Sequence, residues 1–314
     1  MDIKATADKI TENISKVIIG QEKVIKIMLA GIFAGGHILL EDKPGTGKTM
    51  LAKTLARSFS ASFKRVQFTP DLMPSDITGI NIYNQKENEF TFVKGPVFSN
   101  ILLADEINRA TPRTQSSLLE AMEERQVTVD GVTMALDLPF IVIATENPIE
   151  TTGTYPLPEA QLDRFVMKLN MDELAKEQEL AIIERFIHDD PSEKIQPVCT
   201  PDEFLQAADH VKDVHVHETV RGYMTDIVSA TRRSKQISTG VSTRGLLALL
   251  RCSQSYAALS GRGYVEPDDV RTLAPYVLGH RIVTYAAVNY HNKNSEIIED
   301  IIKTIEVPVE KWEI

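Results

Sequence analysis

The stretch from His37 to Leu55, HILLEDKPGTGKTMLAKTL, restricts the possible folds of this chain more than any other segment. Its first part, HILLE, is a short apolar run typical of a buried strand, and the residues after Lys48 have the apolar spacing of a helix. A glycine-rich turn joins the two. Such a turn directs backbone N–H groups and the positive end of the helix dipole at one place, which indicates a site for a phosphate group.

The residue types in this turn fit a nucleotide triphosphate. We expect the Lys48 ammonium to reach the β- and γ-phosphates and the Thr49 hydroxyl to ligate Mg²⁺. Gly45 and Gly47 would let the backbone approach the phosphates, because neither carries a Cβ atom. The residues of this loop that we expect to contact the nucleotide are Gly45, Thr46, Gly47, Lys48, Thr49 and Met50.

One position departs from the usual phosphate loop, in which a glycine precedes four residues and then Gly-Lys-Thr. Asp42 stands where that first glycine is expected. Aspartate is among the few residues that tolerate left-handed backbone geometry, at a cost of about 1 kcal/mol. The residues that would touch phosphate are intact. We therefore expect a working nucleotide site rather than a loop kept only for its shape.

Two further apolar runs end in polar residues that suit nucleotide hydrolysis. ILLADE ends in Asp105 and Glu106, and FIVIATEN ends in Asn147. Asp105 is expected to orient the water around Mg²⁺, and Glu106 to polarise the attacking water. Asn147 is expected to hold that water near the γ-phosphate, although an asparagine in this position also commonly caps a turn.

The first half of the chain alternates short apolar runs with helical spacing, as in a parallel sheet that is covered on both faces. FKRVQF, SNILLADE and PFIVIATEN are further strand candidates. Residues 1–34 and the segment RTQSSLLEAMEER have helical spacing. VTVDGVTMAL is typical of a hairpin with Asp130 and Gly131 in its turn.

The character of the sequence changes near Met171, where a charged amphipathic segment begins. A polar link that contains proline, DDPSEKIQPVCTPDEF, follows it, and helical segments continue to the C-terminus. A length of 314 residues allows one large or two ordinary domains. We expect a nucleotide-binding core over residues 1–175 and a helical domain over residues 190–314.

Two arginines are candidates for stabilising the transition state of phosphoryl transfer. Arg164 lies in PEAQLDRF, after the predicted sheet, and Arg244 lies in GVSTRGLLALL, at the start of a predicted helix. One such arginine is worth about 10³ to 10⁵ in rate. Taken singly, each residue would more commonly be a member of a surface ion pair.

Composition and charge narrow the functional class. The formal charge is 34 − 44 = −10, which argues against a protein that binds nucleic acid mainly by electrostatics. No run of about 18 apolar residues predicts a membrane span. The N-terminus lacks the apolar region of a signal peptide, and Cys199 and Cys252 have no metal-ligand spacing. We expect two reduced thiols in a cytoplasmic protein.

Together these residues resemble the MoxR family of AAA+ ATPases, and the resemblance covers nearly the whole chain. It is densest in FTPDLMPSDITG, KGPVFSNILLADEINRATPRTQSSLLEAMEERQVTVDG and GTYPLPEAQLDRF. It implies an α/β fold, an AAA+ αβα core with a parallel sheet followed by an all-helical lid domain. By this similarity, Walker A contains Lys48 and Thr49, Walker B contains Asp105 and Glu106, sensor 1 is Asn147, the arginine finger is Arg164, and sensor 2 is Arg244.

This chain departs from the family pattern at two positions, and the resemblance adds one further segment that would contact the nucleotide. Asp42 replaces the usual first glycine of Walker A, and Thr243 stands where many members have proline before the sensor 2 arginine. The stretch VIIGQEKV matches the segment that runs beside the adenine in such ATPases. It adds Gly20 and Ile19 as expected nucleotide contacts, with ordinary core packing as the equally supported alternative for the apolar residues before Gly20.

The resemblance implies a homo-oligomeric ring, commonly a hexamer, with ATP and Mg²⁺ between neighbouring subunits. Arg164 would then serve the adjacent subunit's ATP, and Arg244 its own. The segments around DLMPSDITG and VTVDGVTMAL match inserted hairpins that face the ring surface or pore. Members look like chaperones that assemble or activate protein complexes, often inserting a metal cofactor, with a von Willebrand factor A domain protein as partner.

Three functions follow as hypotheses: an ATP-driven remodelling factor, a nucleotide-gated scaffold with little turnover, and a DNA-acting ring. The acidic charge and the lack of a basic tract weigh against the DNA-acting ring. The identity of the client protein does not follow from the sequence. Either Arg109 or Arg125, which lie near Asp105 in the sequence, could also face a neighbouring nucleotide, and a surface or intersubunit ion pair is the more common role.

Overall fold

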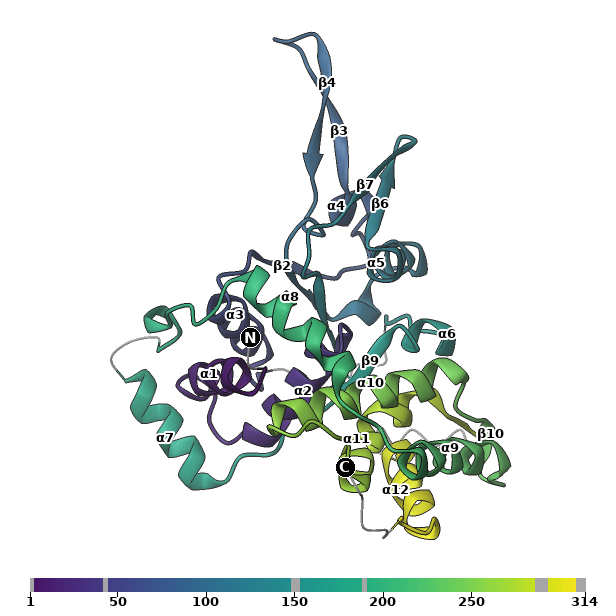
Figure 1. Ribbon diagram of the computed structural model, residues 1–314. Coiled ribbons are helices and arrows are strands. Elements are labelled where there is room, and N and C mark those ends of the chain that lie inside the picture. Colours follow the sequence, from purple (N-terminus) through teal and green to yellow (C-terminus); the bar gives the residue numbers. More distant parts are fainter. Residues whose placement is uncertain (1–2, 42–44, 148–152, 188–190, 286–292, 309–314) are drawn as a thin grey trace.

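The computed structural model describes residues 3–41, 45–147, 153–187, 191–285 and 293–308 (Figure 1). Asp42 lies outside these described residues, so the expectation for its backbone stays a prediction. None of the helices in the described part of the chain is both long enough and apolar enough to cross a lipid bilayer.

A five-stranded parallel sheet forms the centre of the first half, with the strand order β2-β5-β8-β1-β9. Four of its strands were expected from their apolar runs. The edge strand β9 was not expected, because only alternate residues of FVMKL are buried and the apolar run is broken. The strands are β1 (His37–Glu41), β2 (Phe63–Gln67), β5 (Ile101–Asp105), β8 (Ile141–Glu146) and β9 (Phe165–Leu169).

Helices cover both faces of this sheet, as the continuous apolar strands require. In β1, Ile38 and Leu40 join one apolar cluster with helices α1 (Ile3–Ser15), α2 (Glu22–Phe33) and α3 (Lys48–Ser58). Leu39 joins a second apolar cluster on the opposite face with helix α5 (Pro112–Glu124). This alternation confirms the predicted αβα core.

The second half of the chain is helical, as expected, and a short ribbon of strands β10 and β11 is added to it. Phe204 of α8 packs on Phe59, which directly follows α3, and on Phe33 of α2, with ring centroids 5.2 and 4.6 Å apart. Helices from both halves therefore share one apolar core. The elements are α7 (Lys176–Phe186), α8 (Pro201–Asp209), α9 (Glu218–Arg233), β10 (Ile237–Thr239), α10 (Thr243–Leu259), α11 (Pro267–Leu278), β11 (Val283–Thr284) and α12 (Lys293–Thr304).

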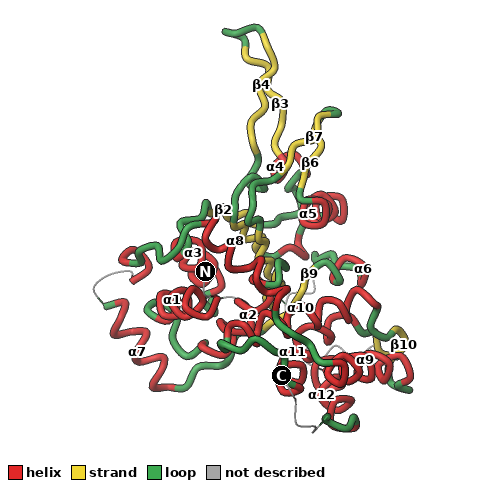
Figure 2. The backbone as a smooth tube through the Cα atoms, in the orientation of Figure 1, coloured by secondary structure: helices red, strands yellow, loops and turns green. Residues whose placement is uncertain are grey.

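Two β-hairpins project from the same side of the molecule (Figures 1 and 2). The longer hairpin pairs β3 (Gly79–Asn84) with β4 (Glu89–Lys94), and the shorter pairs β6 (Gln126–Val129) with β7 (Val132–Ala135). Asn81 donates a 2.7 Å hydrogen bond to Asp130 and links the two hairpins. The turn at Asp130 was predicted. The segment DLMPSDITG leads into the longer hairpin through the short helix α4 (Pro74–Thr78).

Candidate nucleotide-binding site

A cavity of about 490 Å³ lies where the carboxyl ends of the sheet strands meet the start of α3. Four segments that are separated in the sequence contribute to it, namely the glycine-rich turn with the start of α3, strand β2, and the ends of β5 and β8. Its size is in the range of small-ligand sites. The residues that line it are Gly45, Gly47, Lys48, Thr49, Met50, Lys53, Arg65, Gln67, Asp105, Glu106 and Asn147.

The glycine-rich turn has the backbone that an anion cradle needs. Gly45 and Gly47 both have φ of 88°, a left-handed conformation that glycine adopts at little cost. Gly47 immediately precedes α3, so the first N–H groups of that helix have no partner within the helix. These groups and the side chains of Lys48 and Thr49 lie at the cavity. Thr46 lies in the same turn but does not line the cavity.

Asp105 is held at the end of β5 by side chains from both neighbouring strands. Thr145 Oγ1 on β8 donates to Asp105 Oδ1 over 2.6 Å, and Arg65 Nη2 on β2 donates to Asp105 Oδ2 over 2.6 Å. The carboxylate is largely buried, and one of its oxygens faces a cation. Carboxylate oxygens of this kind are among the ligands that Mg²⁺ takes in proteins.

Glu106 has a left-handed backbone, with φ of 55°, which costs roughly 1 kcal/mol for a non-glycine residue. Its N–H donates to Thr145 Oγ1 over 2.8 Å. Its carboxylate Oε2 accepts from Gln67 Nε2 over 2.7 Å and pairs with Arg109 Nε at 3.1 Å. Backbone and side chain are thus both fixed, and the carboxylate lies at the cavity.

Sequence reasoning missed Arg65 and Gln67 as site residues, because FKRVQF was interpreted only as a strand. Both side chains point to one face of the edge strand β2, since they are two residues apart. The available signal was this pair of polar residues on a strand beside the acidic end of β5.

The two additional arginines have different surroundings. Arg109 contacts Glu106 of its own chain, as described above. Arg125 donates to the backbone oxygens of Gly35 over 2.7 Å and Phe140 over 3.3 Å, and burial lowers its pKa. Arg125 therefore braces its own chain, whereas Arg109 contacts Glu106, which lines the cavity.

Arg164 lies at the amino ends of the sheet strands, whereas the cavity lies at their carboxyl ends. Arg164 directly precedes β9, whose first residue, Phe165, pairs with His37 at the start of β1. The glycine-rich turn follows the other end of β1. Five strand residues separate the two edges by roughly 15 Å. Arg164 Nη1 donates to the backbone oxygen of Leu119 over 2.8 Å.

Arg244 lies beside Arg164 and not beside the cavity of its own chain, where it was expected. It is the second residue of α10, and its Nη2 forms an ion pair with Glu123 of α5. The same carboxylate oxygen lies 3.8 Å from Arg164 Nη1. The sequence could not reveal this neighbourhood, because Arg244 and Glu123 are more than a hundred positions apart in the chain.

The segment expected beside the adenine lies between α1 and α2. The Cδ1 atom of Ile18 is 3.9 Å from the position of a Cβ atom on Gly47, so this segment reaches the phosphate turn. Ile19 is partly exposed. Gln178 of α7 covers Gly20 closely enough that a Cβ atom there would lie 2.5 Å from its Nε2.

Two glutamates lie at the carboxyl ends of the adjacent strands β1 and β8. Glu41 at the end of β1 pairs in register with Glu146 at the end of β8, one residue before Asn147. Lys168 Nζ on β9 lies 2.6 Å from Glu41 Oε1. Burial raises the pKa of Glu146 from 4.5 to about 7, with Lys168 opposing the rise and Glu41 adding to it.

Glu146→Gln should change how stability depends on pH. The folded protein holds the Glu146 proton more tightly than the unfolded chain, so the free energy of unfolding should fall between about pH 4.5 and 7 and then level off. Glutamine stays neutral, so the variant should lose that part of the slope. It should be more stable than the parent above pH 7, by up to about 3 kcal/mol.

Urea unfolding at pH 5 and pH 8 measures this effect. The exposed Glu120→Gln on α5 is the matched control and should keep the parent's pH slope. Equal slopes for Glu146→Gln and the parent would contradict the expectation.

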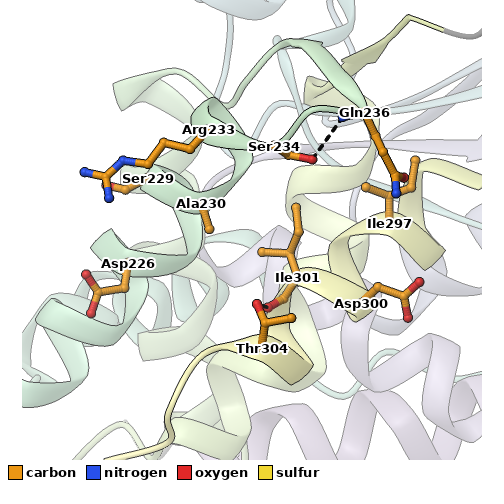
Figure 3. A pocket seen from close by; sticks show the side chains of 10 residues that line it. All are labelled: Asp226, Ser229, Ala230, Arg233, Ser234, Gln236, Ile297, Asp300, Ile301 and Thr304. Atoms are coloured by element: carbon orange, nitrogen blue, oxygen red, sulfur yellow. Dashed lines mark hydrogen bonds between the residues drawn. The ribbon is translucent and has the colours of Figure 1, made fainter.

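A second cavity of about 550 Å³ lies between α9 and α12, far along the chain from the glycine-rich turn (Figure 3). Ile301 lies near its centre, whereas Asp226, Arg233 and Asp300 point in different directions (Figure 3). Its charged groups do not converge on one point, in contrast to those of the first cavity.

Sequence profiles of two families match this chain. Residues 37–167 match the family described as "ATPase family associated with various cellular activities (AAA)", and residues 229–301 match the family described as "AAA lid domain". The first match contains the glycine-rich turn, both acidic residues and Arg164.

Similar proteins match over most of their length. Protein YeaC of Bacillus subtilis (strain 168) is 46% identical over 99% of this chain and 97% of its own. "Chaperone MoxR1" of Mycobacterium tuberculosis is 39% identical over 96% of this chain and 82% of its own. A crystal structure of a Cytophaga hutchinsonii protein is 39% identical, with a TM-score of 0.87, and covers 98% of this chain and 96% of its own.

Proposed function

The chain belongs to the MoxR family of AAA+ ATPases, and from this premise we propose that it hydrolyses Mg²⁺-ATP and uses the cycle to remodel or assemble protein complexes. The observation that carries the proposal is the single cavity that gathers the glycine-rich turn, Asp105, Glu106 and Asn147. ATP supplies the phosphoanhydride bond whose cleavage drives the cycle. The residues of the chain would bind the nucleotide, orient the attacking water and activate that water.

The phosphates would lie against the first turn of α3. The N–H groups that follow Gly47 would donate to the phosphate oxygens, and the Lys48 ammonium would neutralise the β- and γ-phosphates. Thr46 and Met50 would complete the backbone contacts. Ile19 and Gly20 would lie against the adenine, with Gln178 packed behind Gly20.

The residues present also fit Mg²⁺, which usually binds one or two protein oxygens together with substrate phosphates and water. Thr49 and Asp105 line the same cavity and would supply those protein oxygens. Arg65 Nη2 lies 2.6 Å from Asp105 Oδ2, so its guanidinium would have to share that oxygen with the metal or move aside.

Glu106 would accept a proton from the attacking water, and Asn147 would hold that water in line with the γ-phosphate. The hydrogen bond from Gln67 and the ion pair with Arg109 fix the carboxylate before the nucleotide arrives. The Glu106 carboxylate therefore has to reorient less during the reaction.

The positions of the two arginines support a ring. Arg164 and Arg244 lie together at the edge of the sheet opposite the cavity, so neither is placed to reach the nucleotide of its own chain. We propose that both serve the ATP of the adjacent subunit, which replaces the expectation that Arg244 acts within its own subunit. Ring closure, commonly as a hexamer in this family, would then complete each site.

The projecting hairpins support a role in contacting proteins. Ile80, Ile82 and Val93 are half-exposed on one face of the longer hairpin, and Phe90 is 70% exposed on the other. Exposed apolar surface of this kind commonly marks an interaction site. We propose that a client protein binds there. We also propose that the chain acts in the cytoplasm with a von Willebrand factor A domain protein as partner, and that cofactor insertion is one of its tasks.

We also propose the division into a core over residues 1–175 and a lid over residues 190–314. The profile matches at residues 37–167 and 229–301 support it, since each lies within one of these units. Closure of the lid on bound ATP and its release after hydrolysis would move the client.

Phosphate release from Mg²⁺-ATP tests this function directly. Lys48→Ala should abolish both ATP binding and turnover, because the β- and γ-phosphates lose their main counter-charge. Lys9→Ala, an exposed lysine on α1, is the matched control and should behave as the parent. Calorimetry measures binding, and a coupled phosphate assay measures turnover.

Two other outcomes would favour the alternative functions. Tight ATP binding without turnover, at protein concentrations where rings form, would indicate a nucleotide-gated scaffold. Salt-dependent DNA affinity or strand displacement would indicate a DNA-acting ring. No heat on titration of Mg²⁺-bound adenine nucleotides would refute the ATPase proposal altogether.

A further inference from the structure

Glu123 joins the two arginines at the edge of the sheet opposite the cavity. It lies near the C-terminal end of α5, Arg164 lies between the short helix α6 (Glu159–Leu162) and β9, and Arg244 lies at the start of α10. Glu123 Oε2 lies 3.8 Å from Arg164 Nη1 and forms a closer ion pair with Arg244 Nη2. Two arginines from separate parts of the chain therefore lie beside the same carboxylate oxygen of α5.

The backbone beside Glu123 is anchored to the sheet. The oxygen of Met122 lies 3.1 Å from His37 Nε2, and His37 Nδ1 accepts from the N–H of Val142 over 3.0 Å. Burial lowers the pKa of His37 to about 3, so the ring is neutral and can donate at Nε2 while it accepts at Nδ1. The end of α5 is therefore fixed to both β1 and β8.

In the guanidinium groups of Arg164 and Arg244, one terminal nitrogen contacts the protein and the other is available to a further acceptor. Arg164 Nη1 donates to Leu119, and Arg244 Nη2 contacts Glu123. Within the described residues, Nη2 of Arg164 and Nη1 of Arg244 have no hydrogen-bond partner, and the two side chains are 31% and 48% exposed. A planar guanidinium can keep one acceptor while it donates to another.

The charges around this point favour an anion. Asp163 is already engaged by the buried Arg281, with Nε 2.5 Å from Oδ1, and lies 3.9 Å from Arg244 Nε. Three guanidiniums therefore surround two carboxylates, which leaves one excess positive charge at a partly exposed surface. A phosphate group is an acceptor that guanidinium donors match well.

We propose that Glu123 is a positioning residue that holds Arg164 and Arg244 side by side, so that both donate to the γ-phosphate of ATP bound by a second copy of this chain. The inference rests on the proposed function, because it needs a ring with shared sites. The shared carboxylate reduces the repulsion between the two guanidiniums and limits their rotamers before the neighbour docks.

Kinetics of Glu123→Ala and Glu123→Gln test the positioning role. We expect kcat for ATP to fall about 10²-fold in the alanine variant, as is usual when catalytic groups are displaced by about 1 Å. The glutamine variant should lose less, because its amide oxygen still accepts from the arginines. KM for ATP should stay near that of the parent, since the variant's own phosphate turn lies at the other edge of the sheet. Glu124→Gln, the adjacent exposed glutamate, is the matched control.

Mixed rings separate positioning from a purely structural role. Glu123→Ala or Glu123→Gln subunits mixed with Glu106→Gln subunits should regain activity, because at one of the two kinds of mixed interface the Glu123 variant supplies an intact Glu106 and the Glu106→Gln subunit supplies an intact arginine pair. Thermal unfolding of each variant checks the fold. If the alanine variant does not fold, the glutamine variant carries the test alone.

Arg164→Ala mixed with Glu106→Gln is the reference for shared sites. If that reference regains activity and the Glu123 variants do not, the inference fails and the proposed ring stands. If the reference also stays inactive although rings form, the shared-site part of the proposed function fails. Unchanged or increased kcat in Glu123→Ala would also overturn the inference, since an increase would mean that Glu123 competes with phosphate for the arginines.

Discussion

Arg164→Ala is expected to lower kcat for ATP hydrolysis by about 10³- to 10⁵-fold while ATP affinity stays nearly unchanged. The loose transition state of phosphoryl transfer spreads negative charge over the γ-phosphoryl oxygens, and the guanidinium neutralises part of it. Affinity should survive because Arg164 lies at the edge of the sheet opposite its own phosphate turn. Steady-state phosphate release measures kcat, and calorimetry measures binding.

The defect of Arg164→Ala should be repaired by a different subunit. Mixing it with Glu106→Gln should restore part of the activity, because a site with an intact Glu106 can then receive an intact arginine from its neighbour. Arg221→Ala, an exposed arginine on α9, serves as control and should hydrolyse ATP as the parent does. Absence of any rescue, with rings confirmed by light scattering, would count against the shared site.

Glu106→Gln is expected to lower kcat by about 10²- to 10⁴-fold and to leave ATP bound. Glutamine cannot take a proton from the attacking water, whereas its amide oxygen can still accept the hydrogen bond from Gln67. The fold and the phosphate contacts should therefore persist, and the variant should accumulate unhydrolysed ATP.

Single-turnover hydrolysis and analysis of the bound nucleotide measure this effect. Glu120→Gln makes the same chemical change at an exposed position of α5 and should have no effect. If Glu106→Gln retained a kcat close to that of the parent, another group would have to be the base, and the role of Glu106 would be only structural.

The αβα core was predictable because its signals are local. The apolar run of β1, the glycines of the turn and the helical spacing of α3 are contiguous in the sequence, and the same holds for β5 and β8 with their polar ends. Since carboxyl ends of parallel strands meet at one edge of a sheet, Asp105, Glu106 and Asn147 were expected to come together, and they line one cavity.

Other features depended on where a strand or helix lies in the fold. Edge position exposes alternate residues of β9 and so hides it in the sequence. The same kind of exposure in β2 places Arg65 and Gln67 beside two acids nearly 40 residues away in the chain. The helices after residue 190 pack on α2 and α3 through Phe204, which no local pattern indicated.

The sequence by itself determined the phosphate turn, the alternation of strands and helices, and the residues that can carry the chemistry, because strand period, helix period and turn chemistry are properties of short segments. Only the tertiary structure decided where the two arginines lie relative to the cavity of their own chain. Arg244 and Glu123 are 121 residues apart in the sequence, and their contact arises from the packing of α10 near the end of α5. That packing depends on the whole apolar core, so no short segment encodes it.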